Sequence, residues 1–271
     1  VGYLGDGMLD SVAIGEVFAS PPALAFYDAI VDADQGEGVA VLFGNYAGDN
    51  MNVKMAVQMA EDDDIEVKYV VANDDVASAP KAVKEQRHGI AGGFFMWKVG
   101  GARAAKGGSL DDVIASAQNV VNRTKSICVG LEPCVIPALG HSNFKIEDGT
   151  MEFGVGHHGE AGKKVEKLKS ASEMAQEMAE TILNDFDFEE GKEVAVMLSG
   201  LGATPVMELY VLYDEVEKVL AKAGHKVWKT YIGNYVTSLD MNGASLTIVD
   251  LDDEIKELLS EPAVPIGMKN Y

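Results

Sequence analysis

Hydrophobic positions in the first half of the chain alternate between short continuous runs and helical spacing. Residues 38–43 (GVAVLF) and 66–71 (EVKYVV) read as buried strands, and apolar residues between them recur at helical spacing from Met51 to Met59. A further helix is expected over residues 110–121, with Ser109 as its N-cap. Strands that alternate with helices in this way predict a mostly parallel sheet covered by helices.

The second half, from about residue 126, repeats this mixture with more turns. A helix is expected over residues 171–183 and a strand over 194–198, followed by the turn SGLGATP and a long helix to about residue 223. Thr204 would cap that helix, with a proline at its first position. Asn242-Gly243 lies between two apolar runs and predicts a hairpin with a type I′ turn.

The fold class is therefore predicted to be α/β. Two α/β domains are expected, residues 1–125 and 126–271, each with a mostly parallel or mixed sheet flanked by helices. A chain of 271 residues exceeds the commonest size of a domain with a single core and is long enough for two domains.

Composition narrows the class of protein further. Apolar residues make up 47% and charged residues 24%, which are ordinary globular values. The chain contains no run of about 18 uncharged apolar residues, so no membrane span is expected. No secretion signal is visible, although a chain that begins with Val1 says little about a leader. A cytoplasmic protein without a membrane partner is expected.

Charge and cysteine content exclude other classes. The net charge of −21 would repel nucleic acids and anionic membranes, so a nucleic-acid partner is not expected. The two cysteines, Cys128 and Cys134, are too few for a disulfide framework. They also lack the spacing of a zinc site, so no metal is expected.

The segment GNYAGDNMN, residues 44–52, holds the first candidate. Asp49 lies just after a predicted strand and just before a helix, where ligands bind in open α/β sheets. Position alone favours a helix N-cap, while the functional interpretation is a general base. Asn45 and Tyr46 add polar groups nearby and strengthen the second interpretation.

The segment GVGHHGEAG, residues 154–162, holds the second candidate for a functional site. His157 and His158 would rarely share a metal ion, because neighbouring residues of an extended chain point to opposite sides, and no third ligand is apparent. One ring could instead attack a ketone or aldehyde, with the glycines leaving room for a small substrate. From the residues alone, a structural histidine ranks first and covalent catalysis second.

The turn SGLGATP, residues 199–205, precedes a helix and could cradle a phosphate with its backbone N–H groups. It matches neither the Walker A pattern nor GxGxxG. A tight connection between strand and helix is the better interpretation.

Several long motifs together resemble the substrate-binding subunit of dihydroxyacetone kinases. They follow one another in order over nearly the whole chain: GYLGDGMLDSVAIGEVFASP, GNYAGDNMN, LEPCVIPALG, MEFGVGHHGEAG, LGATPVMELY and YVTSLDMNGASLTI. The resemblance implies two α/β domains per subunit and a homodimer. It also implies a kinase with dihydroxyacetone or a similar short ketose as substrate.

The same resemblance assigns roles to residues. The family's active histidine precedes the GEPG-like turn and falls on His158, which would add to the ketone as a hemiaminal. The acid of the NYxGD motif falls on Asp49, which would take the proton of the substrate's hydroxyl. Gly44 and Asn45 are expected to line the substrate site with them. A nucleotide-binding subunit would supply ATP or ADP with Mg²⁺, and no cofactor is expected to bind this chain tightly.

Three departures from the family pattern bear on this interpretation. The family's GGGSGHEP segment, with a further catalytic histidine, is not found here, and a piece of a longer polypeptide is expected. Gly44 stands where the family often has Lys, which suggests a longer ketose such as erythrulose. Ala161 replaces the Pro of GEPG, which is expected to be mild. A non-catalytic coactivator or ketose sensor of the same fold is the alternative function.

Overall fold

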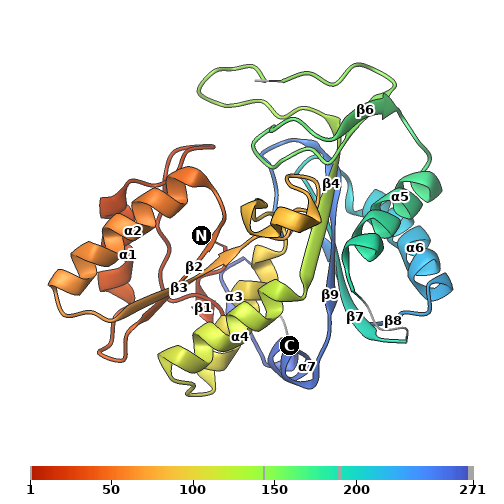
Figure 1. Ribbon diagram of the computed structural model, residues 1–271. Coiled ribbons are helices and arrows are strands. Elements are labelled where there is room, and N and C mark those ends of the chain that lie inside the picture. The colour runs from red at the N-terminus through yellow and green to blue at the C-terminus, as the bar shows by residue number, and fades with distance from the viewer. Residues whose placement is uncertain (1, 143, 188–190, 268–271) are drawn as a thin grey trace. The chain divides into compact units, whose positions relative to one another are not determined.

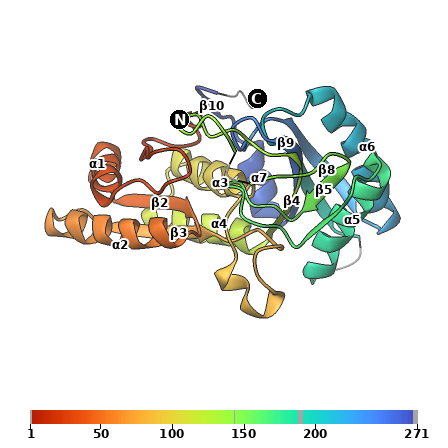
Figure 2. The ribbon, with the colours of Figure 1, turned by 90° about the horizontal axis from the view of Figure 1, so that it is seen from above.

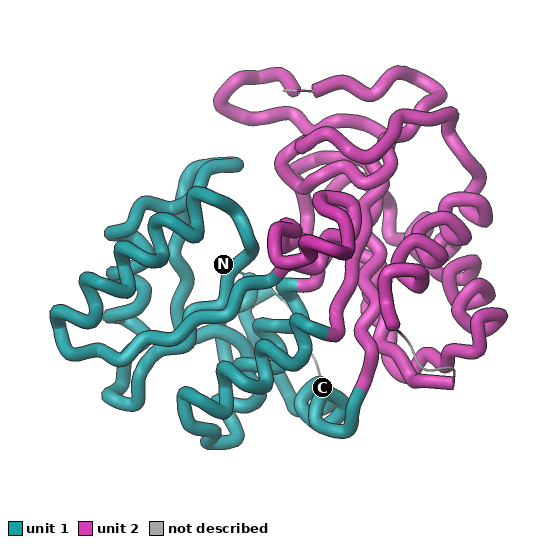
Figure 3. Tube along the Cα trace, viewed as in Figure 1, with its two compact units in different colours: residues 1–72, 93–122, 252–271 teal, residues 73–92, 123–251 magenta. Residues whose placement is uncertain are grey.

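The computed structural model describes residues 2–142, 144–187 and 191–267, which form two compact units. Unit 1 contains residues 1–72, 93–122 and 252–271, and unit 2 contains residues 73–92 and 123–251 (Figure 3). The sequence predicts one boundary near residue 125, whereas the chain passes between the units after residues 72, 92, 122 and 251. Neither unit is therefore one continuous segment.

Unit 1 is built on two short parallel strands with helices on both sides (Figure 1). Its elements are β1 (Gly5–Asp6), α1 (Ala23–Ala33), β2 (Val39–Gly44), α2 (Ala47–Asp62), β3 (Val67–Ala72), α3 (Gly93–Ala105), α4 (Leu110–Asn122), α7 (Asp253–Ser260) and β10 (Val264–Pro265). Strands β2 and β3 pair in parallel from Val39–Val67 to Gly44–Ala72. The two predicted strands and the parallel pairing are confirmed.

The core of unit 1 explains why the helices lie where they do. Phe26 and Ile30 of α1 and Val53 and Ala56 of α2 are buried in one cluster with residues of β2. Spacings of three and four residues place these side chains on one face of each helix. Helix α4 begins as predicted, because the Ser109 hydroxyl accepts from the backbone N–H of Asp112 at 3.3 Å.

Unit 2 is built on a six-stranded mixed sheet in the order β6-β5-β4-β9-β7-β8. Its elements are the 3₁₀ helix η1 (Lys81–Gln86), β4 (Thr124–Glu132), β5 (Thr150–Phe153), β6 (Lys164–Lys167), α5 (Ala171–Asp185), β7 (Glu193–Gly200), α6 (Val206–Lys222), β8 (Lys226–Gly233) and β9 (Asn242–Asp250). Among the described strands of this sheet, only β7 and β8 pair in parallel. The sheet is thus of the mixed kind, with mostly antiparallel neighbours.

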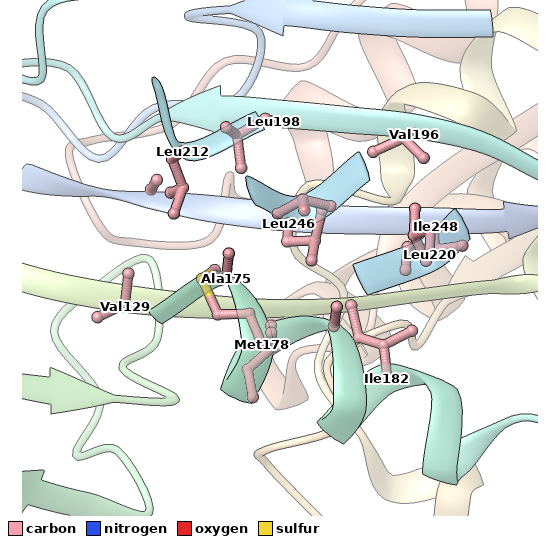
Figure 4. Packing of buried hydrophobic residues seen from close by; sticks show 14 of the residues in the cluster. Val129, Ala175, Met178, Ile182, Val196, Leu198, Leu212, Leu220, Leu246 and Ile248 are labelled. Atoms are coloured by element: carbon pink, nitrogen blue, oxygen red, sulfur yellow. The ribbon is translucent and has the colours of Figure 1, made fainter. Parts of the chain in front are cut away.

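Helices α5 and α6 pack on the same face of this sheet (Figures 1 and 2). Met178 and Ile182 of α5 lie among strand residues such as Val129, Leu246 and Ile248 (Figure 4). All five are at most 1% exposed. Burial of side chains this size contributes roughly 1.5–3 kcal/mol each, so the sheet that carries the loops below is rigidly supported.

Two local predictions in unit 2 are wrong. Asn242-Gly243 forms no hairpin, because both residues begin the continuous strand β9. Thr204 does not cap α6, whose N-cap is Pro205. The Thr204 hydroxyl instead donates to the carbonyl of Gly243 at 2.6 Å and accepts from its N–H at 2.8 Å. The turn before α6 is therefore fastened to the start of β9.

A search of the helices in the described part of the chain finds none with the length and hydrophobicity of a membrane span.

Candidate active site

Asp49 lies in the first turn of α2, directly after the end of β2. The N-cap of this helix is Tyr46, so the simple interpretation of Asp49 as the cap is wrong. A carboxylate in the first turn is still stabilised by the helix dipole. Its Oδ1 accepts a hydrogen bond from the Ser20 hydroxyl at 3.1 Å, and the side chain is half-buried.

Neighbouring side chains fix the segment around Asp49. Asn52 donates to the carbonyl of Pro21 at 2.8 Å, which holds the Ser20 segment against α2. Asn45 accepts from the amide of Asn50 at 2.8 Å and is half-buried. Ser20 lies inside the first long motif but is far from Asp49 in the chain, and no local pattern singles it out.

The loop that carries His158 connects β5 to β6, which pair antiparallel up to Phe153 and Lys164. Backbone hydrogen bonds define its course: the N–H of Gly156 donates to the carbonyl of Glu160 at 2.9 Å, and that of Gly159 to Gly156 at 3.1 Å. Gly159 has a φ of 79°, a conformation that glycine adopts at little cost. The loop therefore has one defined shape.

His158 and Glu160 form the central pair of this loop. Nδ1 of His158 lies 2.9 Å from Oε1 of Glu160, and the backbone N–H of His158 donates to Oε2 at 2.8 Å. Burial alone would raise the pKa of Glu160, but the hydrogen bond and charge of His158 outweigh it and lower that pKa to about 2. An ionised Glu160 only accepts, so Nδ1 of His158 is the donor in this pair, and in the neutral form of the ring the lone pair lies on Nε2.

Glycines around the pair make room for protein atoms. A Cβ on Gly156 would lie 2.1 Å from Oε2 of Glu160, and one on Gly154 would lie 2.7 Å from the Cβ of Ala77. The sequence interpretation assigned this space to the substrate. In the structure it is needed at these two positions for the Glu160 carboxylate and for the segment 73–92.

His157 is set apart from its neighbour by burial. It is 7% exposed, whereas the His158 side chain is 37% exposed. Burial, with the nearby ring of His158, lowers the pKa of His157 to about 4, so its ring is neutral at pH 7. Within the described residues no three His, Cys, Asp or Glu side chains are grouped to hold a metal ion.

A small pocket of about 140 Å³ lies against the same loop, within unit 2. Glu160, Lys163 and three glycines of the loop line it, together with Asp75, Ser78 and His88. Asp75 is 2% exposed, and its Oδ1 accepts from the N–H of Ala77 at 2.8 Å. Burial, only partly offset by that hydrogen bond, raises the pKa of Asp75 to about 7. Nothing in the sequence alone singled this residue out.

The predicted site residues thus form two groups. Gly44, Asn45 and Asp49 lie together at the end of β2 and the start of α2, in unit 1. His158 belongs to unit 2, where the structure adds Glu160 as its partner. The sequence offered one signal for Glu160, an acid two residues beyond the histidine pair.

Comparison with known proteins assigns the family. Residues 1–266 match the Dak1 domain. The chain belongs to the Dak1 family. It is 41% identical over 253 residues to the dihydroxyacetone-binding subunit DhaK of a PTS-dependent dihydroxyacetone kinase from Listeria innocua, a match that covers 93% of this chain and 77% of that protein. The family and the α/β fold class predicted from the sequence are confirmed.

Other Dak1 relatives carry different names. A D-erythrulose kinase of Mycolicibacterium smegmatis is 36% identical over 262 residues, which cover 97% of this chain and 45% of that protein. The solved structure of a dihydroxyacetone kinase operon co-activator superposes with a TM-score of 0.92 at 30% identity, covering 98% of this chain and 82% of that one. Family membership alone therefore leaves both kinase and coactivator open.

Gly156→Ala should separate the His158–Glu160 pair without unfolding the protein, because the new methyl group occupies the position of the carboxylate. Loss of one charge-assisted hydrogen bond is worth roughly 1.5–3 kcal/mol, so the backbone amide of His158, which donates to Glu160, should exchange with solvent about tenfold faster or more. Hydrogen exchange followed by NMR measures this. Gly93→Ala is the control, since its Cβ meets nothing closer than 3.4 Å. An equal exchange rate in the wild type and Gly156→Ala would contradict the pairing.

Proposed function

We propose that this chain is the substrate-binding subunit of a dihydroxyacetone kinase, in which His158 binds the ketose covalently. The observation that supports this best is the pairing of Nδ1 of His158 with an ionised Glu160. The pairing orients the ring and places the lone pair of a neutral imidazole on Nε2, the nitrogen that would attack the ketone.

The proposed addition balances as follows. The lone pair of Nε2 forms a bond to the carbonyl carbon, and the C=O π electrons move to oxygen. The ring becomes an imidazolium, which the Glu160 carboxylate stabilises through Nδ1–H. The carbonyl oxygen gains one proton and the ring gives up the proton of Nδ1, so the hemiaminal is neutral. No oxidant, metal or further reactant is required.

A covalent bond suits this substrate. Dihydroxyacetone is small and polar, and it offers little apolar surface for binding. A reversible bond to its carbonyl supplies affinity and excludes glycerol, which has no carbonyl. It also restricts the orientation of the hydroxyl that is to be phosphorylated.

We assign the second chemical role to Asp49, as the base that takes the proton of that hydroxyl. Its support is the family motif together with its place in the first turn of α2, held by Ser20. The phosphoryl donor would be ATP or ADP with Mg²⁺ on a separate nucleotide-binding subunit. A homodimer of this chain and a cytoplasmic location remain predictions from the resemblance.

One observation favours erythrulose as an alternative substrate. Gly44, where the family often has Lys, ends β2 beside Asn45 and leaves no side chain there. A missing side chain at this rim would accommodate one more hydroxymethyl group. The resemblance to the Mycolicibacterium smegmatis D-erythrulose kinase makes this the first alternative to test.

A coactivator is the second alternative, because the solved coactivator has nearly the same backbone. The presence of both His158 and Asp49 favours the kinase, since a coactivator has no need of a base. A coupled assay with the nucleotide-binding subunit of a dihydroxyacetone kinase decides between them. Product formation with dihydroxyacetone or erythrulose supports the kinase and ranks the two substrates, whereas binding without turnover of either would establish a sensor or coactivator.

A further inference from the structure

The turn between β8 and β9 carries a motif, YVTSLDMNG, that the proposed chemistry does not use. Ser238 of this turn is 1% exposed. Its hydroxyl donates a short hydrogen bond to the backbone carbonyl of His157. Its own N–H donates to the carbonyl of Leu201 at 2.7 Å, and its carbonyl accepts from the N–H of Met241 at 3.0 Å. Ser238 is thus fixed to the sheet and reaches the loop of the active histidine.

The backbone of this turn adopts an unfavourable conformation at Leu239. Leu239 has a φ of 55°, in the left-handed region that a bulky residue rarely occupies. Its carbonyl lies so close to Gly202 that a Cβ there would be 1.9 Å away. Asp240 accepts from the N–H of Val135 at 2.7 Å and braces the other side. Conformations of this kind persist only where the surroundings enforce them, and they gather at functional sites.

The target of Ser238 is one peptide unit, the one that joins His157 to His158. Its carbonyl accepts from Ser238, and its N–H donates to Oε2 of Glu160 at 2.8 Å. A peptide unit is planar and rigid, so hydrogen bonds at both ends fix its rotation. That rotation sets the direction in which the Cα of His158 presents its side chain.

We propose that Ser238 is a positioning residue for His158, acting through the peptide between His157 and His158. The strained turn at Leu239 serves to deliver the hydroxyl to that carbonyl. We call the two hydrogen bonds on this peptide unit the clamp: Ser238 to the carbonyl of His157, and the N–H of His158 to Glu160. The catalytic consequence of the clamp rests on the proposed function, whereas the clamp itself is a property of the folded chain. Loss of the hydroxyl leaves a buried carbonyl without its partner and allows the peptide to rotate, which also weakens the bond from the His158 N–H to Glu160.

The first test measures the clamp without any substrate. Hydrogen exchange of the His158 amide, followed by NMR, should be about tenfold faster in Ser238→Ala than in the wild type, which corresponds to the loss of about 1.4 kcal/mol. Ser245→Ala is the matched control, because Ser245 is 0% exposed and its hydroxyl also donates to a backbone carbonyl, that of Ser199. An unchanged exchange rate in Ser238→Ala overturns the proposal.

The second test measures the consequence for binding. Ser238→Thr and Ser238→Val have nearly the same shape and differ in the hydroxyl, so they replace the alanine variant if it folds poorly. Ser238→Thr should retain ketose affinity, and Ser238→Val should lose about tenfold. Equal affinity of the two variants overturns the positioning role. If the wild type itself binds no ketose covalently, the proposed function fails, and the amide exchange alone then supports or overturns the clamp.

Discussion

Asp49→Asn should lower the rate of phosphoryl transfer by about 10² to 10⁴, the usual contribution of a general base. The substitution keeps the shape of the side chain, and its Oδ1 can still accept from Ser20. Ketose binding on His158 should therefore be unchanged while turnover falls. The measurement is the steady-state rate in the coupled assay, with ketose affinity determined separately by titration.

Asp62→Asn is the control for charge, since Asp62 is an exposed acid at the far end of the same helix. Its turnover should match the wild type. A rate for Asp49→Asn within twofold of the wild type would remove Asp49 as the base. A loss of ketose affinity with unchanged maximal rate would assign Asp49 to binding instead.

Asp75→Asn should stabilise the protein, and more so as the pH rises. The pKa of Asp75 is raised from 3.8 to about 7 in the folded protein, mainly by burial. Between these values the folded state binds more protons than the unfolded state, so the wild type loses stability as pH increases up to about 7. Each pH unit corresponds to 1.36 kcal/mol. The advantage of Asp75→Asn should thus grow by about 3 kcal/mol from pH 5 to pH 7 and then level off.

Urea denaturation of both proteins at pH 5, 6, 7 and 8 measures this difference. Asp28→Asn, which removes an exposed acid of α1, is the control for the loss of one carboxylate. If Asp75→Asn were less stable than the wild type at pH 8, the Asp75 carboxylate would have to be ionised and held by its neighbours. The pocket would then be lined by two negative charges, those of Asp75 and Glu160.

Local patterns in the sequence predicted the elements well where burial follows a simple period. Strands β2, β3 and β7 and helices α4 and α5 lie where apolar runs and helical spacing placed them. The prediction of a hairpin at Asn242-Gly243 was wrong for a physical reason. The glycine is required because a Cβ would lie 2.2 Å from the carbonyl of Val129 on the neighbouring strand. A dipeptide that favours a hairpin thus serves a close approach between strands.

The site could be predicted only as far as local sequence reaches. His158 and Asp49 lie in distinctive motifs, and Glu160 is two residues from its partner. Ser238 lies 81 positions from His157 and Ser20 lies 29 positions from Asp49, so contacts set by tertiary structure decide their roles. Asp75 is perturbed by burial, which no local pattern reports.

The central claim, a bond between His158 and the substrate's carbonyl carbon, can be observed directly. Dihydroxyacetone labelled with ¹³C at its carbonyl is added to the wild type, His158→Ala and His157→Ala, and the label is followed by ¹³C NMR. The account predicts that the protein-bound carbon becomes tetrahedral in the wild type and His157→Ala, and that no such signal forms in His158→Ala. A bound signal that stays in the ketone region in the wild type, or a tetrahedral signal in His158→Ala, would contradict it.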